Sequence, residues 1–137
     1  MPLTFHANVP HWMRRMAGRW ARVLGYTDWK IEISCAPDDE MGSEDEQTVM
    51  GLANALSHYL ATDIVLNEEM RDGADADDYI CHELLHGHYH PFTLFFEQIW
   101  DGRKKVNKNV GRAMLTDLIE ASIQRHVRQL QRARGKS

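Results

Sequence analysis

The sequence predicts an α+β domain: an N-terminal helix, a small, mostly antiparallel sheet of three strands, a short helix with a histidine-rich motif, and a long C-terminal helix. The order of a helix, then strands, then helices is typical of this class. The chain has 137 residues, of which 43% are hydrophobic and 26% charged, as in an ordinary globular protein. This length suffices for one hydrophobic core and is too short for two, so we expect a single domain over residues 1–137.

The N-terminal helix is predicted over Pro10–Leu24, with Gly25 at its end. Apolar residues that recur at helical spacing are expected to face the core: Trp12, Met13, Met16, Trp20, Val23 and Leu24. Arginines occupy the opposite face. The segment is therefore predicted to be an amphipathic helix.

Three segments are predicted to be strands. Trp29–Ser34 alternates between apolar and polar residues, as a half-buried strand does. An acidic loop that contains glycine and serine, Pro37–Gln47, separates it from two further strands at Thr48–Ala53 and Tyr59–Leu66. We expect these three strands to form the sheet.

The remainder of the chain is predicted to be helical after an acidic loop at Asn67–Asp75. The apolar part of a short buried helix is supplied by Ile80, Leu84 and Leu85. Its start is expected among three acidic residues and its end at a proline: Asp75, Asp77, Asp78 and Pro91. An aromatic stretch and a long C-terminal segment are also expected to be helices: Phe92–Trp100 and roughly Asn107–Arg132.

An H-E-x-x-H motif is formed by the residues His82-Glu83-Leu84-Leu85-His86. Residues four apart on a helix lie on the same face, so the two imidazoles could bind one Zn²⁺ ion. The residue after the first histidine lies one step around the helix, close to the metal without binding it. A carboxylate there could take a proton from the metal-bound water, which is the general-base role in metallopeptidases. A purely structural zinc site has no need of Glu83.

A catalytic zinc usually has three protein ligands and a water, so a third ligand is needed. On a continuous helix, His82 and His90 would be separated by about 12 Å of rise, and His88 points to a different side. Glu120 lies at the border of the apolar stripe of the C-terminal helix, where a carboxylate could reach into a cleft. The stripe consists of Leu115, Leu118, Ile119, Ile123, Val127 and Leu130. We therefore favour Glu120, with Asp117, His88 and His90 as alternatives.

Composition narrows the class of protein further. No apolar run approaches the roughly 20 residues of a membrane span. The first ten residues lack the basic and then apolar pattern of a secretory signal. Cys35 and Cys81 form neither a C-x-x-C site nor a disulfide framework, and both lie in apolar segments, where a buried free thiol is common. These features favour a cytoplasmic protein that does not bind a membrane.

Charge is distributed unevenly along the chain, although the net charge is only −4. Between Pro37 and Asp78, thirteen Asp or Glu and one basic residue give −12. From Arg103 to Lys136, ten Lys or Arg and two acidic residues give +8. Solvated acidic loops and a basic helix face explain this pattern most simply. The alternative explanation is that the basic C-terminal helix binds nucleic acid, but the sequence contains no specific nucleic-acid-binding motif.

The motif, followed one helix later by a glutamate, resembles the gluzincin class of zinc metallopeptidases. The short chain, with a helix, a small sheet and the motif helix, resembles the minimal zincin domains of phage and bacterial proteins in the minigluzincin, ImmA/IrrE-like and SprT-like groups. This resemblance implies that His82, His86 and Glu120 bind Zn²⁺ and that Glu83 is catalytic. It also implies that Ala61–Asn67 is the edge strand along which such enzymes bind an extended peptide, as an exposed edge permits.

The sequence thus predicts a zinc-dependent endopeptidase, a hydrolase that acts on a peptide or protein substrate. Two alternatives stay open: a metal-binding module that docks a partner protein without cleaving it, and a SprT-like protease associated with nucleic acid. Retention of Glu83 favours an enzyme over the docking module. The missing nucleic-acid motif counts against the second alternative.

Overall fold

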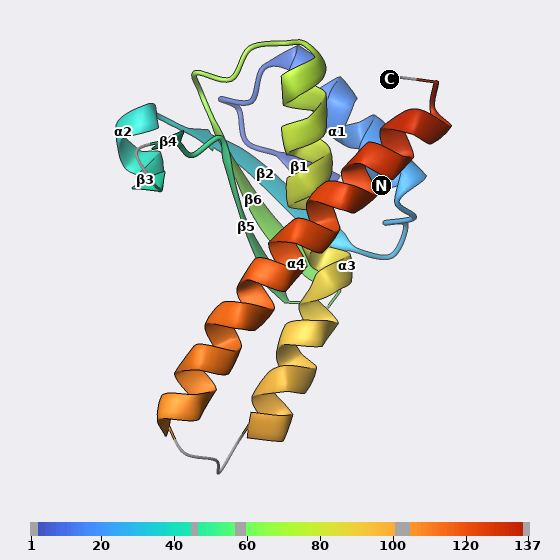
Figure 1. The fold of residues 1–137 in the computed structure, drawn as a ribbon. Coiled ribbons are helices and arrows are strands. Elements are labelled where there is room, and N and C mark those ends of the chain that lie inside the picture. Colours follow the sequence, from blue (N-terminus) through green and yellow to red (C-terminus); the bar gives the residue numbers. More distant parts are fainter. Residues whose placement is uncertain (1–2, 45–46, 57–59, 101–104, 136–137) are drawn as a thin grey trace. The chain divides into compact units, whose positions relative to one another are not determined.

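The structure of the chain, a computed structural model, has the predicted α+β architecture (Figure 1). It describes four ranges of the chain: 3–44, 47–56, 60–100 and 105–135. The residues form two compact units, Met1–Gly87 and His88–Ser137. The single domain expected from the chain length stays a prediction.

The first unit contains a four-stranded sheet in the order β1-β2-β6-β5. Its strands are β1 (Leu3–Phe5), β2 (Lys30–Ala36), β5 (Gly51–Leu56) and β6 (Ala61–Asn67). Strands β1 and β6 both pair with β2 in parallel, whereas β5 runs antiparallel to β6. The expected three-stranded, mostly antiparallel sheet is therefore wrong in strand number and direction. Alternation of apolar and polar residues assigns side chains to faces, but it does not encode the direction of the neighbouring strand.

The strand Ala61–Asn67 forms directly before the motif helix, as predicted, but it is not an edge strand. β6 lies between β2 and β5, so the expectation that residues 61–67 form the edge is wrong. The edge on this side of the sheet is β5, which folds back onto β6 with Gly51 opposite Leu66. The buried side chains of β6 are Thr62, Ile64, Leu66 and Asn67. A strand with this much buried surface is more stable when it is paired on both sides.

The acidic segment 37–47, expected to be a loop, contains short regular elements. They are α2 (Asp38–Met41), β3 (Ser43–Glu44) and β4 (Gln47–Thr48), and β3 pairs with β4. The buried side chain of Asn67 fastens this region to the end of β6. Its Nδ2 donates to Asp38 Oδ1 at 2.8 Å and to the Val49 carbonyl at 2.9 Å. Its Oδ1 accepts a hydrogen bond from the Glu69 amide at 2.8 Å.

Two helices cover one face of the sheet in the first unit: α1 (His11–Val23) and the first part of α3 (Ala74–Trp100) (Figure 1). The buried residues of α1 are Met13, Met16, Ala17, Trp20 and Ala21. Val23, expected to face the core, is 50% exposed because it occupies the last position of the helix. The Trp20 indole donates a 2.8 Å hydrogen bond to the buried carboxylate of Asp77, which joins α1 to the start of α3.

Helix α3 unites the predicted motif helix and the aromatic segment in one element. Pro91, expected to end the first helix, lies inside α3. An internal proline removes one backbone hydrogen bond and crowds the preceding turn, at a cost of about 3 kcal/mol. The helix nevertheless continues through Pro91, from Ala74 to Trp100. Asp75 and Asp77 lie in its first turn, where carboxylates suit the positive end of the helix dipole.

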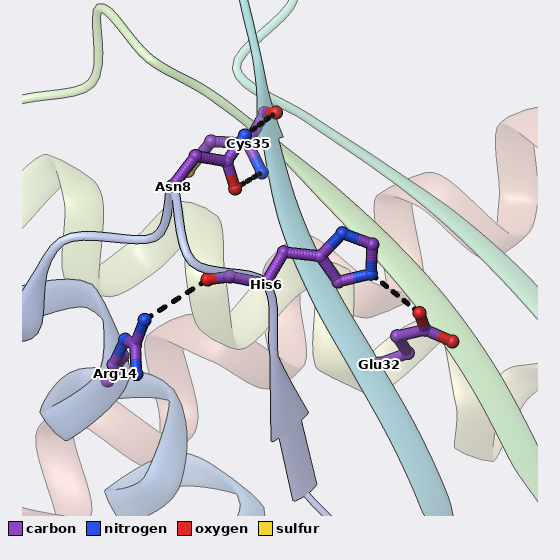
Figure 2. Close-up of polar contacts among 5 residues, drawn as sticks. All are labelled: His6, Asn8, Arg14, Glu32 and Cys35. Atoms are coloured by element: carbon purple, nitrogen blue, oxygen red, sulfur yellow. Dashed lines mark hydrogen bonds and ion pairs between the residues drawn. The ribbon is translucent and has the colours of Figure 1, made fainter.

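Polar contacts attach the chain after β1 to β2 and to α1 (Figure 2). The side chain of Asn8 donates to the Cys35 carbonyl at 2.7 Å and accepts from the Cys35 amide at 3.3 Å. Arg14 donates to the His6 carbonyl at 3.1 Å, and His6 contacts Glu32 at 2.6 Å. Burial, and secondarily the charge of Glu68, raises the pKa of the Cys35 thiol, so this side chain stays neutral inside the core.

The second unit consists of the end of α3 and of α4 (Lys105–Ala133), which matches the predicted C-terminal helix. Of the predicted apolar stripe, Ile123 and Val127 are fully buried, whereas Leu118 is 64% exposed. The stripe is therefore wrong at Leu118, because only part of α4 is packed.

Across the described ranges, none of the helices combines the length and the apolar character needed to cross a membrane.

We predict that Asn67→Ala lowers the free energy of unfolding by about 2–3 kcal/mol. The substitution removes three hydrogen bonds at a buried site and leaves the Val49 carbonyl and the Glu69 amide without this partner. Urea denaturation measures the loss. Asn54→Ala, on the exposed side of β5, is the control and should change stability by no more than about 0.5 kcal/mol. Equal losses in both variants would contradict the role of Asn67.

Candidate metal centre

The two motif histidines face the same side of α3. Their imidazole ring centroids lie 5.2 Å apart, and both side chains are half-buried. This is the arrangement expected for residues four apart on a helix. The turn between them carries Leu84 and Leu85, which are fully buried and anchor the helix in the core. The buried leucines thus hold the helix with both histidines turned in one direction.

Glu83 lies against the backbone of the edge strand. Its side chain is only 8% exposed. A Cβ atom placed on Gly51 would lie 2.6 Å from Glu83 Cγ and 3.0 Å from Cδ, so β5 passes next to this side chain. A glycine inside a strand often marks a close approach of backbone. That signal was present in the sequence, but it could not identify Glu83 as the neighbour.

The opposite side of the motif turn is held by two aromatic residues. The Tyr26 hydroxyl donates a hydrogen bond to the Leu84 carbonyl, and the Tyr26 and Trp29 rings meet edge to face at 5.0 Å. Both pack on Gly87, where a Cβ atom would lie 2.7 Å from the Tyr26 oxygen and 3.2 Å from Trp29 Cζ3. The helix can approach these rings so closely because position 87 has no side chain.

The expected third ligand, Glu120, lies in α4. Among the described residues, His82, His86 and Glu120 form a group that could hold a metal ion. Two imidazoles and a carboxylate also form the donor set of a catalytic zinc site.

The alternative ligands do not belong to this group. Asp117, His88 and His90 were the other candidates, and none is part of the His–His–Glu group among the described residues. Asp117 is exposed and instead borders a surface hollow with Met114 and Leu118.

A tyrosine hydroxyl or a histidine imidazole could stabilise a transition state, and the residues that we consider for this role are Tyr59, Tyr79, Tyr89, His90 and His126. The hydroxyl of Tyr89 lies 3.3 Å from His126 Nδ1, so these two candidates contact each other. Tyr79 is 42% exposed and borders a hollow of about 370 Å³ at the beginning of α3. Tyr59 lies outside the described residues. The structure singles out none of these side chains for the role.

Comparisons with known proteins identify no family for this chain. No protein-family model matches the chain, and neither a curated protein nor a solved structure matches it. The resemblance to zincins therefore rests on the motif and on the order of the elements.

We expect the purified protein to bind about one Zn²⁺ per chain and to lose most of it in His82→Ala or His86→Ala, since each substitution removes one imidazole ligand. Metal analysis after dialysis measures the zinc content. His88→Ala, an exposed position on the same helix, is the control and should retain wild-type zinc. Stoichiometric zinc in a His82→Ala/His86→Ala double variant would refute the site.

We also expect Gly87→Ala to destabilise the first unit by about 1–3 kcal/mol, because the new methyl group would push Tyr26 and Trp29 away from α3. Gly18→Ala is the matched control. It adds the same methyl group to a helix, where the nearest neighbouring atom, Leu3 Cδ2, lies 3.9 Å away. Thermal or urea unfolding should show a loss of stability for position 87 and none for position 18. A similar gain in stability for both variants would show that the packing of Tyr26 and Trp29 tolerates the methyl group.

Proposed function

We propose that the protein is a zinc-dependent endopeptidase, a hydrolase of peptide bonds. The observation that carries this proposal is the position of Glu83. Its carboxylate is buried, follows the first of two histidines that face one way, and lies beside the edge strand of the sheet. A metal site that only stabilised the fold would have no use for a carboxylate there.

His82, His86 and Glu120 would hold the ion. Their donor atoms, two imidazole nitrogens and a carboxylate oxygen, support this ligand set. A zinc ion bound there would lower the pKa of a water toward about 7 and polarise the carbonyl of the scissile bond.

Glu83 would act as the general base and then as the acid. It would accept the proton of the attacking water and pass it to the nitrogen of the leaving amine, whose departure breaks the C–N bond. The low exposure of Glu83 favours proton transfer to the reacting groups over exchange with bulk solvent. Its place after the first histidine keeps it off the ligand face of α3. Together these properties favour an enzyme over a docking module.

A substrate peptide would add to β5, rather than to the interior strand at 61–67. The Met50 carbonyl accepts a hydrogen bond from the Asn67 amide, and Gly51 lies opposite Leu66. In an antiparallel pair, hydrogen-bonded residues alternate with non-bonded ones. The N–H and C=O groups of the next residues inward, Gly51, Ala53 and Ala55, therefore point to the free edge. These groups could bind an extended backbone by strand addition.

A cytoplasmic location belongs to this proposal. Nucleic-acid binding through the basic C-terminal helix stays an alternative prediction without a specific contact to favour it. Salt dependence would distinguish it, because contacts with phosphates weaken steeply as the salt concentration rises.

We predict that Glu83→Gln keeps its zinc but loses peptidase activity by about 100-fold or more, because the variant removes the base and leaves the ligands. Cleavage of a peptide library, read by mass spectrometry, and metal analysis provide the two measurements. Glu69→Gln, at an exposed position outside the site, should behave as the wild type. Wild-type cleavage by Glu83→Gln would show that the mechanism is wrong. A wild-type protein that binds zinc but cleaves nothing would favour the docking module.

A further inference from the structure

We propose that Gly51 is a positioning residue, which keeps the Glu83 side chain in the orientation that catalysis requires and aligns the substrate with it. The proposal rests on the proposed peptidase function. All atoms that carry it belong to the first unit of the chain.

The need for glycine at this position is steric. Gly51 is not among the residues with a positive φ, so its backbone conformation would accept alanine. The surroundings leave no room for alanine, because its Cβ atom would lie 2.6 Å from Glu83 Cγ. Distances below about 3.0 Å are essentially never seen for a Cβ atom. The absent methyl group is therefore what leaves room for the Glu83 side chain.

An alanine at position 51 would move Glu83 rather than the strand. The overlap involves Cγ, Cδ and Oε1 of Glu83, with the last at 3.2 Å, and no backbone atom is among these three nearest contacts. β5 is held by its pairing with β6 along the whole strand, from Gly51 to Leu56. A side chain rotates at lower cost than a paired strand shifts. Rotation about χ1 would carry the carboxylate away from its present position.

The same residue offers its backbone to the substrate. The N–H and C=O groups of Gly51 point to the free edge, because the neighbouring residue Met50 is the one that bonds to Asn67. A peptide bonded at this point would be the part of the substrate strand nearest to Glu83. Ala53 and Ala55 lie on the same face of β5 as Gly51, but each carries a methyl group. Gly51 is therefore the residue of this face that leaves room for the Glu83 side chain. Gly51 would thus fix which part of the bound peptide lies next to the general base, Glu83.

Gly51→Ala tests this inference through kinetics. We expect kcat to fall about 100-fold, the effect of misplacing a catalytic group by about 1 Å, while KM changes less than about threefold because the backbone groups of the edge remain. Zinc content should equal that of the wild type. Gly18→Ala adds the same methyl group where the nearest atom is 3.9 Å away and should leave kcat unchanged. An unchanged kcat in Gly51→Ala would overturn the positioning role.

A thermal double-mutant cycle tests the contact independently of activity. Gly51→Ala alone should lower Tm by about 3–6 °C. In a Glu83→Ala background the overlapping atoms are gone, so the same substitution should no longer lower Tm. Equal shifts in both backgrounds would overturn the proposal, because the methyl group would then meet something other than Glu83. A wild-type protein that cleaves no peptide would refute the proposed function and the positioning role with it, whereas the cycle would still decide whether the contact exists.

Discussion

The close packing of one turn of α3 is the constraint on which the first unit depends. Gly51 allows the edge strand to meet Glu83 on one side, and Gly87 allows Tyr26 and Trp29 to meet the helix on the other. Leu84 and Leu85 fill the core between these contacts. A protein interior is packed as densely as an organic crystal, so a single methyl group at either glycine has no vacant space to enter. The orientation of the motif side chains follows from this packing.

Two buried polar groups fix the ends of the chain segment that leads into α3. Asn67 closes the end of β6 with three hydrogen bonds, and Asp77 in the first turn of α3 accepts one from the Trp20 indole. Buried polar groups cost free energy unless they are paired, and pairing makes them specific for one arrangement. The helix therefore begins at a defined place beside α1 and the sheet. Its motif lies two turns further along.

The topology of the sheet gives the candidate site its substrate edge. Because β5 folds back antiparallel onto β6, the sheet ends beside α3 with a strand whose outer backbone groups are unpaired within the sheet. The side of β5 that meets α3 carries glycine and alanine, whereas Leu52 and Leu56 lie on the exposed face. Small residues bring the strand close to the helix. An edge and a buried carboxylate thus come together in one unit of the chain.

The sequence by itself determined the α+β class, the approximate positions of the main helices and strands, and the placement of His82 and His86 on one face, because these depend on local periodicity. It did not determine that Pro91 lies within α3, that 61–67 is an interior strand, or that the sheet is mainly parallel. Those features depend on contacts between residues distant in sequence, which alternation and spacing do not encode. The same holds for Gly51. Its lack of a side chain is visible in the sequence, but only the tertiary structure shows that the Glu83 side chain occupies the space where a Cβ atom would lie.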